Sequence, residues 1–138
     1  MRILIVEDND ELRNYLLQTL SEEYTVQTCS NGKEALTIIP EYKPELVISD
    51  IMMPQQDGFA FAEEIRRKNP DIPILFLTAL DDIGSKRKGF HAGVDDYMVK
   101  PVDMDELVLR VEALLRRAKI RNENILQIGS LTLVRDEM

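Results

Sequence analysis

Short apolar runs recur along the chain at intervals that suit buried β-strands. Four of them contain no charged residue, at positions 3–6, 46–48, 74–77 and 97–99, a pattern typical of central strands covered on both faces. Residues 24–28 alternate apolar and polar side chains, which indicates an edge strand with one face in water. The pattern therefore predicts five strands.

Between these runs, apolar residues recur at helical spacing. Asn9 or Asp10 is a possible N-cap for a first helix, and Asn31 for a second. The apolar positions of these two helices are Leu12, Leu16 and Leu20, and then Ala35, Leu36 and Ile39. Further helices are expected over 59–67, over 82–92 and from about Asp103, the last with a stripe at Leu107, Val111, Leu114 and Leu115.

The strict alternation of strands and helices, with short connections, decides the fold class. It predicts right-handed crossovers between parallel strands. The expected fold is a doubly wound α/β fold, in which a five-stranded parallel sheet is covered on both faces by five helices.

Composition adds a size class and a compartment. At 138 residues the chain has the length of one domain that buries a core without disulfides. Cys29 is the one cysteine, and there is neither a signal peptide nor a run of about 18 apolar residues, so a cytoplasmic protein with no membrane contact is expected. A net charge of −8 argues against DNA binding by this region itself, because DNA is a polyanion.

Two polar features predict surface positions rather than sites. Arg116, Arg117, Lys119 and Arg121 gather late in the chain, and such a charge run usually marks a solvated face. His91 is the lone histidine. On a polar helix it is interpreted as a surface residue and not as a metal ligand or phosphodonor.

Polar residues end four of the expected strands. Glu7 and Asp8 follow the first, Asp50 the third, Thr78 the fourth and Lys100 the fifth. Ligands of open α/β sheets bind beyond the carboxyl ends of the strands, so these side chains are expected to converge on one crevice. Any one of them alone could equally be a turn former, but four strand ends together favour a site.

Three carboxylates at one place repel each other, so they need protons or a hard cation. Mg²⁺ is the cation this donor set predicts, because it takes oxygen ligands and bridges to phosphate, and no Cys or His cluster suggests zinc. Beside such a cation Asp50 can attack phosphorus and form an aspartyl phosphate. The Thr78 hydroxyl and the Lys100 ammonium suit the charge on the transferring oxygens.

Four segments that hold these residues resemble, in order and spacing, the signatures of receiver domains of two-component response regulators. They are Leu-Ile-Val-Glu-Asp at 4–8, Ser-Asp-Ile-Met-Met-Pro at 49–54 with Asp57-Gly58, Leu-Thr-Ala at 77–79, and Asp-Asp-Tyr-Met-Val-Lys-Pro at 95–101. The resemblance covers about residues 1–119. It implies a flavodoxin-like receiver fold that takes a phosphoryl group from a sensor histidine kinase in the presence of Mg²⁺, a switch rather than a turnover enzyme.

The resemblance also implies a role for each residue near the metal. Asp50 would be the phosphoacceptor and, with Asp8, a direct metal ligand. Glu7 would act as a ligand through water, and Met52 would supply only its backbone carbonyl.

Four further residues receive roles in the same way. Thr78 and Lys100 would bind the phosphoryl oxygens, and Thr78 would also take part in the switch. Tyr97 would be the aromatic side chain whose rotamer reports activation, although ordinary packing near a strand end is an alternative. The Lys100–Pro101 peptide bond would be cis, because resembling receivers use that bend to aim the lysine.

The end of the chain suggests which kind of receiver this is. After residue 119 a polar stretch leads to apolar alternation at 126–133, which a receiver does not need. We interpret 120–138 as a linker and the truncated start of a winged-helix effector domain of the OmpR/PhoB class, with its opening strand at 126–133. DNA is therefore expected to be bound only through the missing domain. A plain hydrophilic tail is the alternative.

Charged residues on the last helices and strand predict a dimer. Lys86, Asp96, Glu106 and Arg110 occupy the fourth helix, the fifth strand and the fifth helix. Receivers of the OmpR/PhoB class pair such residues across a two-fold axis, which lets each pair form twice. A homodimer on phosphorylation is therefore expected, with merely solvated charges as the alternative.

Other functions fit the sequence less well. A haloacid-dehalogenase-like phosphatase would need a second carboxylate where Met52 stands. A stand-alone or hybrid-kinase receiver in a phosphorelay would share every site residue and differs only in the tail. A calcium loop at 8–10 is excluded by Leu12 and Arg13, which stand where a ligand and a glycine belong, and a flavin would lack a phosphate-binding loop after the first strand.

Overall fold

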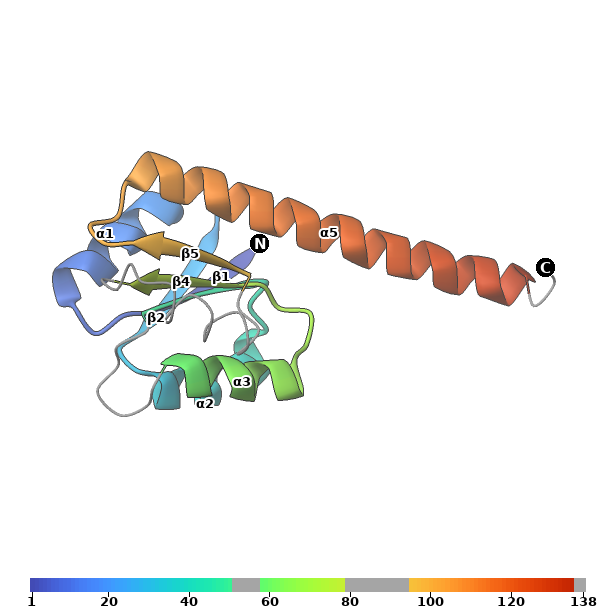
Figure 1. Ribbon diagram of the computed structural model, residues 1–138, viewed down its shortest axis with the longest axis horizontal. Helices are drawn as coiled ribbons and strands as arrows, with labels where there is room; N and C mark the ends of the chain where they lie inside the picture. Colours follow the sequence, from blue (N-terminus) through green and yellow to red (C-terminus); the bar gives the residue numbers. More distant parts are fainter. Residues whose placement is uncertain (51–57, 79–94, 136–138) are drawn as a thin grey trace.

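Five parallel strands form the centre of the molecule (Figure 1). The structure is a computed structural model and describes residues 1–50, 58–78 and 95–135. The strands are β1 (Arg2–Val6), β2 (Thr25–Cys29), β3 (Leu46–Asp50), β4 (Ile74–Thr78) and β5 (Asp96–Val99). Their order is β2-β1-β3-β4-β5 and every neighbouring pair is parallel, so the predicted doubly wound sheet is confirmed.

The two edges of the sheet were not equally predictable. β2 lies at one edge and its burial alternates as expected. β5 is the other edge, so its interpretation as a central strand was wrong. Tyr97 packs into the core on one face of the sheet and Met98 into the core on the other. An apolar run indicates that both faces of a strand are covered, but it does not indicate whether both of its backbone edges pair with neighbouring strands.

Four helices lie within the described residues: α1 (Asp10–Leu20), α2 (Gly32–Tyr42), α3 (Gly58–Lys68) and α5 (Met104–Arg135). Asn9 caps α1 by accepting a hydrogen bond from the Leu12 amide at 2.9 Å, and Asn31 caps α2 through the Glu34 amide at 2.8 Å, as predicted. Asp103 Oδ1 accepts hydrogen bonds from the Asp105 and Glu106 amides in the first turn of α5. The helix expected over 82–92, with His91, lies outside the described residues.

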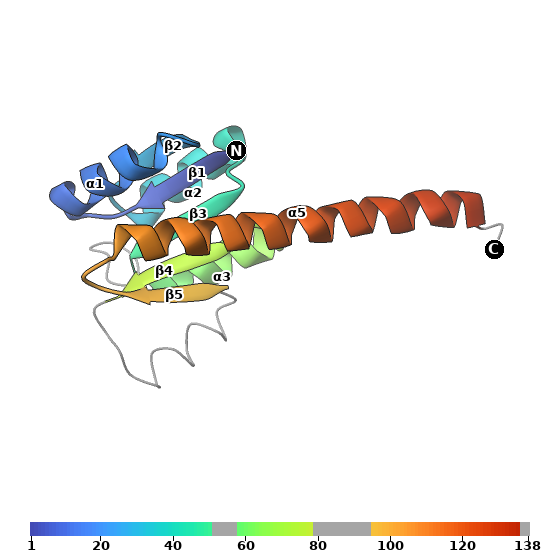
Figure 2. The same cartoon turned by 90° about the horizontal axis from the view of Figure 1, so that it is seen from above.

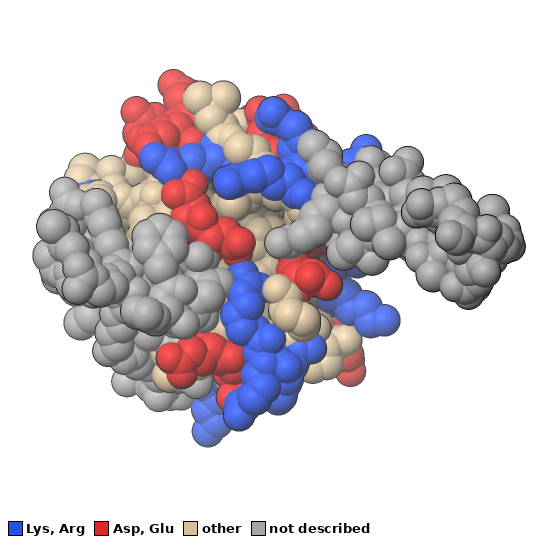
Figure 3. Space-filling model, turned by 45° about the vertical axis from the view of Figure 1, so that its right-hand side comes forward, with Lys and Arg blue, Asp and Glu red and all other residues tan. Residues whose placement is uncertain are grey.

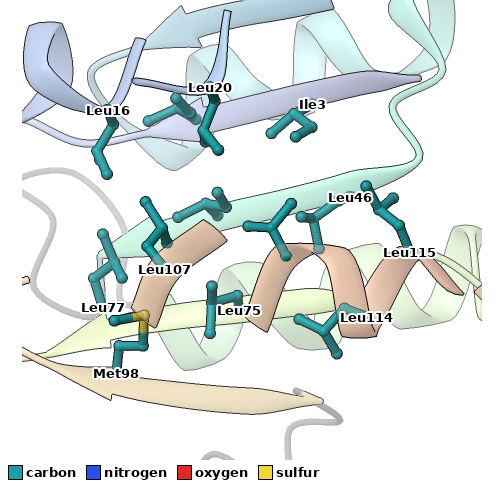
Figure 4. Close-up of a cluster of buried hydrophobic side chains, with 13 residues drawn as sticks. Ile3, Leu16, Leu20, Leu46, Leu75, Leu77, Met98, Leu107, Leu114 and Leu115 are labelled. Carbon is teal, nitrogen blue, oxygen red and sulfur yellow. The ribbon is translucent and has the colours of Figure 1, made fainter. Parts of the chain in front are cut away.

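The helices divide the core into two layers. α1 and α5 cover one face of the sheet and α2 and α3 the other (Figures 1 and 2). Figure 4 shows the layer below α1 and α5, where leucines of both helices point toward the sheet. Its labelled side chains are Ile3, Leu16, Leu20, Leu46, Leu75, Leu77, Met98, Leu107, Leu114 and Leu115.

The end of the chain differs from the expectation. α5 is 32 residues long and continues to Arg135, projecting past the sheet (Figures 1 and 2), so the strand expected at 126–133 was wrong. A strand needs a neighbouring strand for its backbone hydrogen bonds, whereas an established helix adds one internal hydrogen bond for each further residue. The division into a receiver over 1–119 and a separate unit after it stays a prediction.

Charged side chains cover much of the surface. On the face in Figure 3, basic side chains gather next to acidic ones. Arg116 and Arg117 are exposed, as expected for a solvated face. None of the helices in the described ranges combines the length and the apolar character needed to cross a membrane.

Arg66 joins three segments at the amino ends of β4 and β5. Its Nη2 lies 2.5 Å from Asp95 Oδ2, and its Nη1 donates to the carbonyls of Ile72 and, at 3.2 Å, Pro70. The same Asp95 oxygen accepts the Ile74 amide at 2.8 Å. These contacts tie the end of α3 to the loop before β4 and to the start of β5.

The Arg66 network gives a stability prediction. We expect Arg66→Ala to lower the free energy of unfolding by about 1–3 kcal/mol, because Asp95 and the loop carbonyls lose a partly buried donor. Arg67→Ala is the matched control: its side chain is 69% exposed and pairs within α3 with Glu64, so about 0.5 kcal/mol or less is expected. Urea unfolding followed by circular dichroism measures both, and equal losses would contradict the assignment.

Cys29, the last residue of β2, carries a buried thiol. It is 6% exposed, and its Sγ lies 3.6 Å from the Asn31 carbonyl. Burial, and secondarily the charge of Glu34, raises the pKa of the Cys29 thiol to about 12 from an ordinary value of 9.0. The thiol is therefore protonated, and a poor nucleophile, at neutral pH.

This shift gives a pH prediction. Because the folded pKa is the higher one, the thiol stabilises the fold fully below pH 9 and loses this contribution between pH 9 and about 12. The difference in free energy of unfolding between wild type and Cys29→Ala should be constant from about pH 6 to 8 and then shrink by up to about 1.4 kcal/mol per pH unit. Denaturant titrations at several pH values test it, and a difference that stays flat to pH 11 would refute it.

Candidate functional site

The carboxyl ends of β1 and β3 bring three acidic residues together. These strands are neighbours in parallel register, so the residues that end them meet at one edge of the sheet. Glu7 and Asp8 follow β1 and Asp50 is the last residue of β3. Each offers a carboxylate oxygen, and these oxygens all lie within 4.8 Å of one another. The predicted convergence of the three carboxylates is confirmed.

Lys100 completes the cluster from the far edge of the sheet. Its Nζ lies 3.0 Å from Asp50 Oδ2, to which it donates a hydrogen bond, and 3.1 Å from Glu7 Oε1. Its backbone amide donates to the Thr78 carbonyl at 2.7 Å, and the Lys100–Pro101 peptide bond is cis, as expected. The lysine therefore bridges the ends of β1 and β3 although its own strand pairs only with β4.

Glu7 is fully buried and is held by several hydrogen bonds. Its amide donates to the Cys29 carbonyl at 3.0 Å, and its own carbonyl accepts Arg13 Nη1 at 2.9 Å. Its Oε2 accepts the Asn9 amide at 3.0 Å. Its Oε1 forms no hydrogen bond, although it is buried beside Lys100.

The contacts of Asn9 and Arg13 with Glu7 were not anticipated from the sequence. The sequence pattern identifies Asn9 only as a helix N-cap and Arg13 only as a residue that excludes a calcium-binding loop. One sequence signal was available, because a basic residue in the first turn of a helix opposes the helix dipole, and Arg13 stands there in α1.

Burial and neighbouring charges act in opposite directions within the cluster. Burial raises the pKa of Glu7 and the charge of Asp50 adds to this, while the Asn9 amide and Lys100 lower it; the net shift is upward. Burial lowers the pKa of Lys100, but its contacts with Asp50 and Glu7 outweigh burial and the net shift is again upward. Lys100 is thus held as an ammonium, one positive charge against three carboxylates.

The cluster fits a hard divalent cation. Its donors are all oxygen, its carboxylates outnumber its ammonium, and Glu7 Oε1 is a buried acceptor with no hydrogen bond. The contact of this atom with Lys100 Nζ at 3.1 Å is an ion pair that offsets only part of the negative charge of the cluster, and oxygen-only sites with excess negative charge are those Mg²⁺ takes. Glu7, Asp8 and Asp50 are the described residues that could hold it. Met52 lies outside the described residues.

Thr78 lies next to Lys100, whose amide donates to the Thr78 carbonyl, and Tyr97 lies farther back on β5. Thr78 ends β4 and is fully buried. Tyr97, 8% exposed, packs edge to face on Phe76 with ring centroids 5.9 Å apart. Phe76 and Thr78 are two residues apart on β4 and thus share one face of the sheet. Roles for Thr78 and Tyr97 in a switch stay predictions.

The residues expected at a dimer face are paired within the chain. Arg110 donates to both carboxylate oxygens of Asp96 at 2.8 and 2.9 Å and lies 2.9 Å from Glu106 Oε1. These two carboxylates raise the pKa of Arg110 further. Lys86 lies outside the described residues, so its part in such a face is untested.

The chain is similar to a known family of domains and to longer proteins named as transcriptional regulators. The family model described as response regulator receiver domain matches residues 3–112. The probable transcriptional regulator ycf27 of Cyanidium caldarium is 40% identical over 140 residues, covering 95% of this chain and 56% of its own length. The transcriptional regulatory protein PcoR of Escherichia coli is 41% identical over 133 residues, covering 96% and 59%.

A solved structure extends the similarity to three dimensions. The putative response regulator of Chloroflexus aurantiacus superimposes with a TM-score of 0.79 at 37% identity, covering 83% of this chain and 97% of that one. The chain thus spans somewhat over half the length of the curated relatives it matches and almost the whole of that solved chain.

Proposed function

The chain belongs to the response regulator receiver domain family, and on that premise we propose that Asp50 accepts a phosphoryl group from a sensor histidine kinase and thereby switches an attached DNA-binding domain. The observation that carries the proposal is the Lys100 ammonium lodged between Asp50 and Glu7, 3.0 and 3.1 Å from their oxygens. A buried carboxylate with a matched cation beside it is poised for phosphoryl transfer.

Asp50 acts as the nucleophile in this proposal. One of its carboxylate oxygens forms the new bond to phosphorus, and the bond from phosphorus to the donor's histidine nitrogen breaks. Bound Mg²⁺ would offset the charge of the carboxylates and of the incoming phosphoryl oxygens. Lys100, already within 3.0 Å of Asp50, supplies a donor to those oxygens, and Thr78 supplies its hydroxyl. The protein acts as a phosphoacceptor switch rather than a turnover enzyme.

The switch would pass from Thr78 to the edge of the sheet. Thr78 moving toward the phosphoryl group would alter the space next to Phe76 on β4, and Tyr97 packs on Phe76. Tyr97 belongs to β5, the edge strand. A change in Tyr97 packing would therefore reshape the surface of β5 and α5 without rebuilding the sheet.

This surface is proposed to form a symmetric dimer after phosphorylation. In the single chain Arg110 satisfies Asp96 and Glu106, so dimerisation would exchange intrachain ion pairs for pairs across a two-fold axis. Such an exchange fixes the alignment of the two subunits more than it adds to the affinity of the dimer. Leu109 and Val99, which are 66% and 39% exposed, supply apolar area on the same elements.

Control of transcription is proposed from the relatives. The curated relatives carry names of transcriptional regulators and are longer than this chain. We place the receiver at 1–119 and the connection to an effector domain at 120–138, where α5 projects past the sheet. DNA binding would then belong to the effector domain.

The acceptor is tested by mass spectrometry. With acetyl phosphate and Mg²⁺ the wild type should gain the mass of one phosphoryl group, and EDTA should prevent the gain. Asp50→Asn should lose the gain completely while its circular dichroism spectrum is unchanged, because the amide cannot act as the nucleophile. Asp105→Asn, which changes an exposed carboxylate on α5, is the control and should be modified normally; a modified Asp50→Asn would disprove the assignment.

The dimer is tested by analytical ultracentrifugation of phosphorylated protein. The wild type should dimerise, whereas Arg110→Glu should remain monomeric because it places like charges against Asp96 and Glu106. Arg117→Glu reverses an exposed charge on the same helix and should dimerise like the wild type. A monomeric wild type, or an Arg110→Glu that dimerises equally well, would remove the proposal.

A further inference from the structure

Arg13 is the fourth residue of α1, near the end of the helix where the dipole by itself disfavours a cation. The first helical hydrogen bond, from the Arg13 amide to the Asn9 carbonyl, is 2.9 Å long. The positive end of a helix dipole favours anions, such as the Asp10 and Glu11 side chains found in the same turn. A residue that breaks a local rule often serves a site nearby.

The side chain of Arg13 connects α1 to the acidic loop. Its Nη1 donates to the Glu7 carbonyl at 2.9 Å, and its Nη2 pairs with Asp10 Oδ1. Only 20% of the Arg13 side chain is exposed, whereas Asp10 is 81% exposed. The guanidinium therefore links the residue before Asp8 with the first residue of α1.

Three hydrogen bonds and one ion pair fix Glu7. The Cys29 carbonyl and the Asn9 amide are backbone groups, which a substitution does not delete. Arg13 and Lys100 are the side-chain partners. Lys100 also contacts Asp50, so of these two residues Arg13 is the one that can be replaced without losing a direct contact to the carboxylates of the cluster.

We propose that Arg13 is a positioning residue for the divalent-cation site: it clamps the Glu7 carbonyl so that the Glu7 and Asp8 carboxylates stay in place for Mg²⁺. The inference rests on the metal assignment in the proposed function. Groups that orient metal ligands from behind typically change affinity by about 10- to 100-fold when removed.

An effect of charge and an effect of positioning would change the Mg²⁺ affinity in opposite directions when Arg13 is replaced. Arg13 carries a positive charge and contacts the Glu7 carbonyl; deleting that charge makes this region more negative, so electrostatics alone would tighten Mg²⁺ binding. Loss of positioning would weaken it. A purely structural role would lower the melting temperature and leave the affinity of the folded protein unchanged.

The experiment measures Mg²⁺ affinity by isothermal titration calorimetry, with no phosphodonor, on wild type, Arg13→Gln and Arg13→Lys. Arg13→Gln should raise the dissociation constant about tenfold or more. Arg13→Lys should have a dissociation constant between those of the wild type and Arg13→Gln, because one ammonium keeps the charge but does not span Glu7 and Asp10 with two nitrogens. If the glutamine variant does not fold, the lysine variant alone tests the proposal.

Arg67→Gln is the matched control. It breaks another ion pair spaced three residues apart on a helix, that of Arg67 with Glu64, and should leave Mg²⁺ affinity unchanged. As a second readout, labelling of Arg13→Gln by acetyl phosphate should be slow at low Mg²⁺ and recover at saturating Mg²⁺.

Two failures can be told apart. An unchanged or tighter dissociation constant in Arg13→Gln would overturn the inference about Arg13 alone. A wild type that binds no Mg²⁺ would overturn the metal assignment and this inference with it.

Discussion

Three carboxylates at one edge of the sheet repel each other, and the surrounding fold has to offset that repulsion. The fold brings Glu7, Asp8 and Asp50 within 4.8 Å of one another, at a cost that like charges always carry. The Lys100 ammonium offsets part of it by contacting Asp50 and Glu7. The amino terminus of α1, which starts two residues after Asp8, offsets a further part through its dipole. What remains is a site with excess negative charge, which could hold a hard cation.

A rigid scaffold is needed to hold groups that repel each other. The neighbouring strands β1 and β3 are fully buried along the register that ends at the site, and helices cover both faces. Close packing leaves little freedom for strand ends to move apart. Local hydrogen bonds then refine the arrangement: Glu7 is bonded through its amide, its carbonyl and one carboxylate oxygen. The packed sheet as a whole thus holds the three carboxylates together against their mutual repulsion.

The same sheet offers a route from the site to the surface. Lys100 follows the edge strand β5, and its amide is bonded to Thr78 at the end of β4. Tyr97, on β5, contacts Phe76 on β4, and Arg110 of α5 holds Asp96 at the start of β5. In the proposed switch, a change of charge at Asp50 would pass along these contacts to β5 and α5, which carry the exposed side chains of Val99 and Leu109. An edge strand suits this role because only one of its sides is tied into the sheet.

The fold class and most of the site could be predicted from the amino-acid sequence. Apolar runs that end in Glu7, Asp50, Thr78 and Lys100, alternating with capped helices, sufficed to predict a parallel sheet and the convergence of these residues, because parallel neighbours end at one edge. The folded structure was needed to show which strands are edges, that Arg13 and Asn9 hold Glu7, that Arg110 pairs within its own chain, and that α5 continues through 126–133. Periodicity reports which side chains are covered. It does not report which of several nearby partners a charged group selects, because that choice depends on distances of a few ångströms between segments remote in sequence.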